Sequence, residues 1–168
     1  MHTANVVTAW ATATTDRIRE AIAYAGLDPR VLAALTLVAS HDGCSQDWLR
    51  QRIGLTQSGT VRLVDRISSR GQIQRGASTG RGVPLHITES GRQYLREWQV
   101  VQARMVDELL AGLTPDQREA LVDGMANALA SERRVGHQAD ATCRTCSWPA
   151  CGSDCPVDRS AVVAETTR

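Results

Sequence analysis

The segment Gly54-Leu-Thr-Gln-Ser-Gly-Thr-Val-Arg-Leu-Val-Asp-Arg-Ile-Ser-Ser-Arg-Gly71 decides how the rest of the chain is organised. Thr56 is typical of a helix N-cap, because its hydroxyl can accept an orphan N–H of the first helical turn. Gly71 is typical of the position just beyond a helix, where the backbone usually becomes left-handed. The segment therefore predicts a helix between these two residues.

This helix is predicted to have one buried face and one exposed face. Val61, Val64 and Ile67 recur at helical spacing, with Leu63 beside them, so we expect them to face the core. Small polar side chains and free N–H groups in the first turn of such a helix can contact a phosphate backbone and reach base edges. The other face carries Gln57, Ser58, Thr60, Arg62, Arg66 and Arg70.

The flanking sequence turns this helix into part of a larger motif. Residues 45–53 form a short helical run, and Gly54-Leu55 makes the turn to the next helix. Residues 72–75 and 83–87 are two short β-like runs joined by a glycine-rich loop, which predicts a hairpin. Pro84 in the second run indicates an edge strand, since proline cannot donate to a ladder. Helix, turn, helix and hairpin together predict a winged helix, whose second helix enters the major groove of DNA.

Charge is distributed unevenly along the chain. The formal net charge is only +1, but residues 48–86 hold seven arginines against one acid, Asp65, which leaves −5 for the remainder. A basic run alone is more typical of a solvated face. Within a helix-turn-helix, the same asymmetry indicates a nucleic-acid interface. These arginines are Arg50, Arg52, Arg62, Arg66, Arg70, Arg75 and Arg81.

Residues 54–66, together with Thr88-Glu-Ser-Gly91 after the hairpin, resemble the MarR family of bacterial transcriptional regulators; the resemblance covers residues 28–130. It implies a homodimer that binds a pseudo-palindromic double-stranded DNA operator, usually as a repressor, and is often released by a small phenolic ligand or an oxidant. It also places Arg81 at a wing tip that reaches the minor groove, although Ala77-Ser-Thr-Gly80 replaces the acids usual there. The expected DNA-contacting residues are Thr56, Gln57, Ser58, Thr60, Arg62, Arg66, Arg75 and Arg81.

Apolar stripes on the terminal helices indicate a dimerisation layer, because helices at both ends of the chain need partners. The predicted fold is mainly α with a small β wing: an N-terminal dimerisation helix (1–27), a winged helix-turn-helix domain (28–87) and C-terminal dimerisation helices (88–132). By analogy with the family, an effector pocket is expected between the winged domain and the terminal helices. It would lie near Trp10, Tyr24 and His41.

Residues 133–168 are predicted to be a linker, a cysteine-rich knuckle and a flexible tail, because residues 133–141 are polar and show no periodicity. The family resemblance does not cover this segment. Four thiolates can close a tetrahedral zinc site, hold an iron–sulfur cluster, or form two reversible disulfides, and incidental clustering is the fourth alternative. The spacing is C-x2-C-x4-C-x3-C, formed by Cys143, Cys146, Cys151 and Cys155.

Other classes of function find less support in the sequence. No signal peptide and no apolar run long enough to cross a membrane are visible, so we expect a cytoplasmic protein that has no membrane partner. No Ser/His/Asp set, phosphate-binding loop or paired acid indicates an enzyme. Two alternatives remain: a thiol or metal redox protein, and a protein-interaction module that uses the cysteine segment. Cys44 is either a half-buried structural residue or a redox-sensing thiol.

Overall fold

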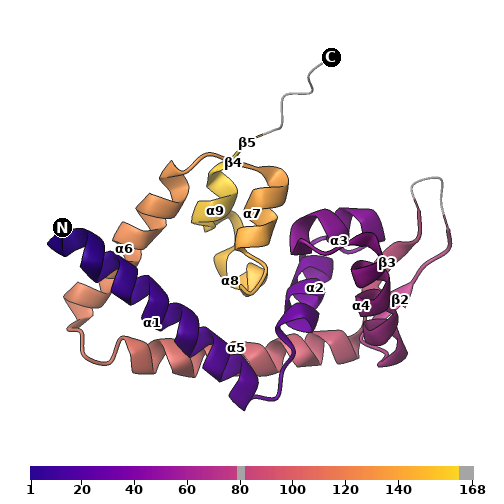
Figure 1. The fold of residues 1–168 in the computed structure, drawn as a ribbon, viewed down its shortest axis with the longest axis horizontal. Helices are drawn as coiled ribbons and strands as arrows, with labels where there is room; N and C mark the ends of the chain where they lie inside the picture. Colours follow the sequence, from indigo (N-terminus) through magenta and orange to yellow (C-terminus); the bar gives the residue numbers. More distant parts are fainter. Residues whose placement is uncertain (79–81, 163–168) are drawn as a thin grey trace.

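The computed structural model describes residues 1–78 and 82–162 (Figure 1). Arg81 and the tail beyond residue 162 therefore lie outside the described residues, and both the predicted wing-tip contact and the predicted flexible tail stay predictions. The predicted fold class, mainly helical with a small β wing, is confirmed. The elements are α1 (His2–Tyr24), α2 (Pro29–Ser40), β1 (Cys44–Ser45), α3 (Gln46–Ile53), α4 (Gln57–Ser69), β2 (Ile73–Arg75), β3 (Pro84–Ile87), α5 (Glu89–Leu109), α6 (Pro115–Ser131), β4 (Arg134–Val135), α7 (Gly136–Thr142), α8 (Trp148–Cys151), a 3-10 turn η1 (Gly152–Asp154), α9 (Pro156–Arg159) and β5 (Ala161–Val162).

Helix boundaries follow the capping residues that the sequence contains. The Asp28 carboxylate accepts the amide of Arg30 at 2.8 Å, and the Thr56 hydroxyl accepts that of Gly59 at 3.1 Å. Thr114 and Gln117 form the reciprocal capping box that starts α6. Each cap satisfies amides that have no partner inside the helix, which is why these positions fix the helix starts. Gly71, at φ +67°, follows α4 in the expected left-handed conformation.

The winged helix is built around the buried face of α4. That face consists of Thr60, Leu63, Val64 and Ile67, which follow one another at i, i+3, i+4 and i+7. The predicted placement of Val61 in this stripe is wrong, because its side chain is 37% exposed. Thr60 occupies the inward position at the start of the stripe, since its hydroxyl bonds to a backbone carbonyl. The core around this stripe contains Val31, Ala34, Leu35, Leu37, Val38, Leu49, Leu63, Val64, Ile67, Ile73, Leu85 and Ile87.

The wing is a three-stranded antiparallel sheet in the order β1-β3-β2. The hairpin strands pair Ile73 with Ile87, while β1, which the sequence reading missed, pairs Cys44 with Leu85. The predicted edge position of Pro84 is therefore wrong, because β3 is the central strand. Pro84 is nevertheless the first residue of that strand, a position where a missing N–H is tolerated.

Helices α1 and α2 pack on α5. In Figure 1, α1 crosses α5 and α2 stands above it. The indole of Trp98 is 2% exposed and belongs to a second core with Ile22, Leu27 and Leu32. Its near-complete burial within one protomer makes Trp98 a core residue. Tyr94, one turn earlier, accepts the Asp28 amide on its hydroxyl at 2.7 Å, which ties α5 to the start of α2.

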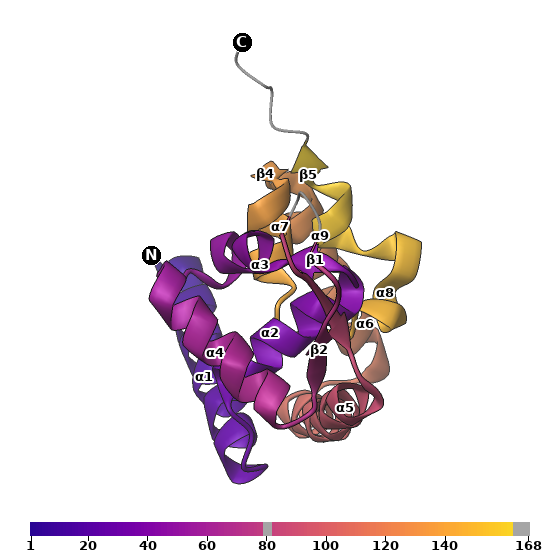
Figure 2. The same cartoon turned by 90° about the vertical axis from the view of Figure 1, so that its right-hand side faces the viewer.

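The C-terminal cap, defined here as residues 134–162, is folded where the sequence predicted a linker. Strands β4 and β5 pair in parallel and bracket α7, α8 and α9. Arg134 is 6% exposed and donates to the carbonyl of Leu129 at 2.6 Å and to the hydroxyl of Ser160 at 2.9 Å. The sequence prediction used the spacing of apolar residues, and a buried arginine held by hydrogen bonds does not contribute to that spacing. The fold of this segment was therefore not predicted. Figures 1 and 2 place α7 beside α3.

No single helix among residues 1–78 and 82–162 is both long and apolar enough to cross a membrane, although α1 and α2 taken together pass that test of length and composition across a 94° bend.

Candidate functional site

The exposed end of α4 is the first candidate site. Thr56, Gln57 and Ser58 are exposed at the start of this helix, and with Val61 and Arg62 they line an open hollow on the surface. The amides of Gln57 and Ser58 have no acceptor inside the helix, so this end carries partial positive charge. Such an end is suited to contact a phosphate.

Thr60 is removed from the predicted DNA-contacting set. Its side chain is fully buried, and its hydroxyl donates to the Thr56 carbonyl at 3.0 Å. The sequence reading put Thr60 on the polar face because threonine is polar. A threonine hydroxyl can instead bond to the carbonyl four residues earlier, which allows this side chain to be buried inside a helix.

Most of the basic charge predicted for this region is paired within the protein. Arg66 contacts Asp28 at 2.9 Å and Arg75 contacts Asp65 at 2.5 Å. Arg50 and Arg52 are also paired, and the Arg52 side chain, 13% exposed, faces the cap rather than solvent. Within residues 48–78, Arg62 and Arg70 form no ion pair with any described residue. Arg62 is the one of these two that lies beside the exposed start of α4, so it is the arginine best placed to contact a ligand.

Two carboxylates, those of Asp28 and Asp42, form hydrogen bonds that hold the elements of this region in place. Although burial raises the pKa of Asp28, the hydrogen bonds from two amides of the first turn of α2 and the nearby Arg66 guanidinium hold it below its usual value of 3.8. At the base of the wing, the hydrogen bond from His86 lowers the pKa of Asp42, which also accepts the Ile87 amide at 3.1 Å. Both groups are therefore ionised near neutral pH, where they hold α4 and β3 in place.

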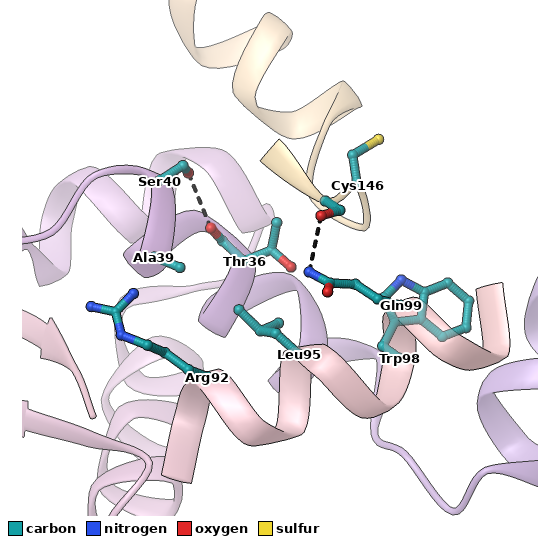
Figure 3. A pocket seen from close by; sticks show the side chains of 9 residues that line it. Thr36, Ala39, Ser40, Arg92, Leu95, Trp98, Gln99 and Cys146 are labelled. Carbon is teal, nitrogen blue, oxygen red and sulfur yellow. Dashed lines mark hydrogen bonds between the residues drawn. The ribbon is translucent and has the colours of Figure 1, made fainter. Parts of the chain in front are cut away.

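A cavity of about 210 Å³ lies between α2, α5 and the cap (Figure 3). Apolar side chains from Leu95 and Trp98 form much of its wall, and Arg92 supplies a cation at one side. Figure 3 also shows the Cys146 sulfur directed away from Leu95 and Thr36. The full lining is Thr36, Ala39, Ser40, Arg92, Leu95, Trp98, Gln99, Cys146 and Ser147.

The sequence predicts an effector pocket between the winged domain and the terminal helices, near Trp10, Tyr24 and His41. This cavity also lies between the winged domain and α5, but its lining differs from those three residues. Trp10, Tyr24 and His41 do not line it. Tyr24 is 93% exposed and borders a separate shallow groove between α1 and α5. His41 faces the neighbouring helix, where its ring lies 4.5 Å from that of Trp48. The residues that do line the cavity come partly from the cap, which the family resemblance did not cover.

The cap joins the winged helix to α5 through two sets of contacts. On α3, Arg52 Nε lies 2.5 Å from Asp140 Oδ2, and the Arg52 guanidinium stacks 3.7 Å from the Trp48 ring centroid. On α5, Trp98 Nε1 donates to the Thr145 carbonyl at 2.8 Å, and Gln99 Nε2 donates to Ser147 Oγ at 2.9 Å. The cap therefore spans the gap between the helix-turn-helix and α5, and it closes one side of the cavity.

The four clustered cysteines all belong to the cap. Cys143 and Cys155 are buried with their sulfurs 4.0 Å apart, whereas Cys146 and Cys151 are exposed. A hydrogen bond between Cys143 and Cys146 raises the pKa of the first thiol and lowers that of Cys146 to about 7, with the nearby Arg144 charge contributing. No group of three or more His, Cys, Asp or Glu side chains in the described part of the chain is already arranged to hold a metal ion.

Cys44 is a different kind of thiol. It lies half-buried in β1, and burial raises its pKa to about 11. Because the thiolate is the reactive form, such a thiol is almost entirely protonated and unreactive near neutral pH. Of the two alternatives that the sequence left open for Cys44, these properties favour the structural one.

Known proteins to which this chain is similar are described as MarR family proteins or as transcriptional regulators. Residues 25–82 match a family model described as MarR family. An uncharacterised helix-turn-helix-type transcriptional regulator of Bacillus subtilis is 24% identical over 106 residues, which are 62% of this chain and 65%, just under two thirds, of that relative. A probable transcriptional regulator from Pseudomonas aeruginosa is 25% identical with a TM-score of 0.53, covering 69% of this chain and 91% of that one.

A MarR family protein from Mycobacterium tuberculosis, solved in complex with salicylic acid, has the same fold. It is 22% identical with a TM-score of 0.54, and the match covers 71% of this chain and 90% of that one. The Bacillus subtilis and Pseudomonas aeruginosa proteins are both described as transcriptional regulators.

The contact between the cap and α3 leads to a first prediction. Asp140→Ala leaves the Arg52 guanidinium partly buried without a counter-ion, which typically costs about 3 kcal/mol. Amide hydrogen exchange in α7 should then become roughly 100-fold faster, while the core of α2 keeps its protection. The matched control is Asp47→Ala, which removes the exposed partner of Arg50 on the same helix α3. Unchanged exchange in α7 of the Asp140 variant would show that this ion pair does not hold the cap.

Proposed function

We propose that this protein is a MarR-type transcriptional regulator, which binds a double-stranded DNA operator as a homodimer and represses transcription until a small aromatic acid occupies its cavity. The observation that carries the proposal is the exposed start of α4. This end of the helix presents unpaired amides, two small polar side chains and the unpaired Arg62 on one surface. An α-helix fits the major groove of B-DNA, and a winged helix uses this helix for recognition.

The polar groups on this surface suit different parts of the duplex. The amides of Gln57 and Ser58 suit a phosphate oxygen, because the helix terminus adds partial positive charge. The Arg62 guanidinium can reach a guanine edge with two parallel hydrogen bonds, which is the commonest base-specific contact. Arg66 and Arg75 are partly exposed but are engaged with Asp28 and Asp65, so we assign them a secondary role of backbone contact.

Apolar surface on the terminal helices supports the homodimer. Helix α6 has no buried residue within the protomer, although it is 17 residues long. A helix with so little burial gains little stability on its own, so its apolar side chains need a partner surface. A second copy of the chain would cover this surface and place two α4 helices on successive turns of DNA. The exposed apolar side chains are Val6 and Val7 of α1, Val100 of α5, and Val122 and Met125 of α6.

The cavity supports a small acidic ligand. Its volume of about 210 Å³ suits a molecule with a single aromatic ring, since a cavity of about 150 Å³ admits benzene. The Leu95 and Trp98 side chains offer an apolar wall, and the Arg92 guanidinium offers a partner for a carboxylate. The salicylic acid named with the Mycobacterium tuberculosis structure has this chemistry. Occupancy would alter the packing of α2 against α5 and thereby the spacing of the two α4 helices.

Arg62→Ala should weaken operator binding by about 1–3 kcal/mol if this side chain reads a base. The measurement is a titration of operator DNA identified by selection from a random library, at several salt concentrations. Arg104→Ala is the matched control, because it removes an arginine that is 82% exposed on α5, away from α4. Equal affinities of the Arg62 variant, the control and the wild type would remove α4 from the interface.

Val7→Asp should convert the dimer to monomer at micromolar concentration, because a charge buried without a partner is costly. Light scattering coupled to size exclusion gives the mass directly. Val83→Asp serves as control, since Val83 is an exposed apolar residue of the wing and lies outside the proposed interface. A wild-type protein that is monomeric under these conditions would contradict the proposed assembly.

Arg92→Gln should weaken salicylate binding roughly 10- to 100-fold, because it removes the charge partner of the carboxylate. Calorimetric titration measures the affinity, and operator release on adding salicylate measures the response. Arg96→Gln, one turn further along α5, removes an exposed arginine that pairs with Glu89 and does not line the cavity. Binding of equal strength in both variants would place the ligand elsewhere.

A further inference from the structure

We propose that the C-terminal cap is a zinc knuckle in which Cys143, Cys146, Cys151 and Cys155 hold one zinc ion per chain. The site lies outside the DNA-facing surface and next to the cavity. Its role is to organise the cap that joins α3 to α5. The proposal rests on four observations: the spacing of the sulfurs, the pairing of the four thiols, the small size of the cap and the contacts that its loops make.

The separation of the two buried sulfurs fits a shared metal. Cys143 Sγ and Cys155 Sγ are 4.0 Å apart. Two ligands of a tetrahedral zinc with Zn–S bonds of about 2.3 Å are roughly 3.8 Å apart, whereas a disulfide needs about 2.05 Å. The observed separation is therefore close to one edge of a zinc–thiolate tetrahedron and nearly twice the length of a disulfide.

The other two thiols lie next to this buried pair. Cys146 lies near Cys143, and Cys151 near Cys155, since each pair is close enough for its members to interact. Cys146 and Cys151 are also close enough to each other to interact electrostatically. The described residues do not present a closed ligand set, so the exposed pair must turn inward to complete it. Exposed side chains change rotamer easily, which keeps the cost of this movement small. Binding exchanges the four thiol protons for one Zn²⁺ and releases the protons to solvent.

The cap is too small to be held by its apolar residues alone. Among the side chains that the structure describes, its own core consists of Ala139, Cys143, Cys155 and Val157, with Leu129 of α6 packed against it. Segments below about 40 residues usually need a metal, disulfides or a partner to become stable. Two of the four core residues are cysteines, so a metal at this point would stabilise the centre of the cap directly.

The proposed site controls the contacts that the cap makes with the rest of the protein. Thr145 and Ser147 flank Cys146 in the sequence, and they are the residues that bond to Trp98 and Gln99 of α5. Asp140, which pairs with Arg52 of α3, lies one helical turn before Cys143. Fixing the sulfurs therefore fixes both sets of contacts at once.

The experiment measures metal in the full-length protein. Protein is purified anaerobically with a thiol reductant from cells supplied with zinc and iron, and its metal content and visible absorbance are measured. The metal is then removed with a chelator, and the metal-free protein is titrated with Co²⁺. The visible absorption of a Co²⁺–thiolate complex reports tetrahedral ligation by sulfur. Cys146→Ser and Cys151→Ser test the exposed ligands, which contribute little to the fold, and Cys44→Ser is the matched control outside the cap.

We expect close to one zinc per chain in the wild type and in Cys44→Ser. We expect at least tenfold weaker zinc binding in Cys146→Ser and Cys151→Ser. Operator binding retained by Cys151→Ser, which does not line the cavity, is the evidence that the winged helix is intact. Iron with inorganic sulfide and a brown colour would overturn the assignment to zinc. Absence of metal after zinc loading under reducing conditions, or equal zinc affinity in the cap variants and the control, would overturn the site itself.

Discussion

The burial of one face of α4 in the core that it shares with α2, α3 and the wing is the constraint on which the rest of the structure depends. With Thr60, Leu63, Val64 and Ile67 turned inward, the rotation of α4 about its axis is fixed. Because successive residues of a helix are turned by about 100°, this choice alone puts Arg62 outward. If the buried face of α4 were shifted by one residue, Val61 would lie inward in place of Thr60. The exposed face of the helix would then turn by about 100°. The position of the candidate DNA interface is therefore a result of core packing.

Helix α5 connects the winged helix to the N-terminal helix α1 through a series of close contacts. At its start, Gly91 packs so closely on the wing that an added Cβ would overlap the Gln72 carbonyl. One turn later Tyr94 holds the start of α2, and the next turn buries Trp98 below α1. The winged helix and the apolar terminal helices are thus fixed to the same rigid element. The cavity lies between α2 and α5, at the place where a bound molecule would alter this arrangement.

The sequence predicted the elements that local chemistry determines and missed those that depend on distant contacts. Caps such as Asp28, Thr56 and Thr114 act within a few residues, and the cap at Thr56 predicted the start of α4 correctly. Burial of Thr60 depends on a hydroxyl–carbonyl bond that a hydropathy pattern does not record. The central position of β3 depends on the two-residue strand β1, and the fold of the cap on a buried Arg134; neither gives a periodic signal. The ion pairs of Arg66 and Arg75 are likewise invisible in a count of charges.

The docking of the cap on α3 has a consequence for the order in which the chain folds during synthesis. Arg52 and Asp140 are 88 residues apart, whereas the contacts of the winged helix are mostly closer in sequence. At about 5–20 residues per second, a ribosome needs roughly 4–18 s to add the intervening chain. Within that interval, α2, α3 and α4 can fold, but α3 lacks the counter-ion for Arg52. The cap, which emerges after the winged helix, therefore completes a part of the protein that precedes it in the chain. A chain truncated before residue 134 would contain a winged helix whose α3 lacks the counter-ion of Arg52.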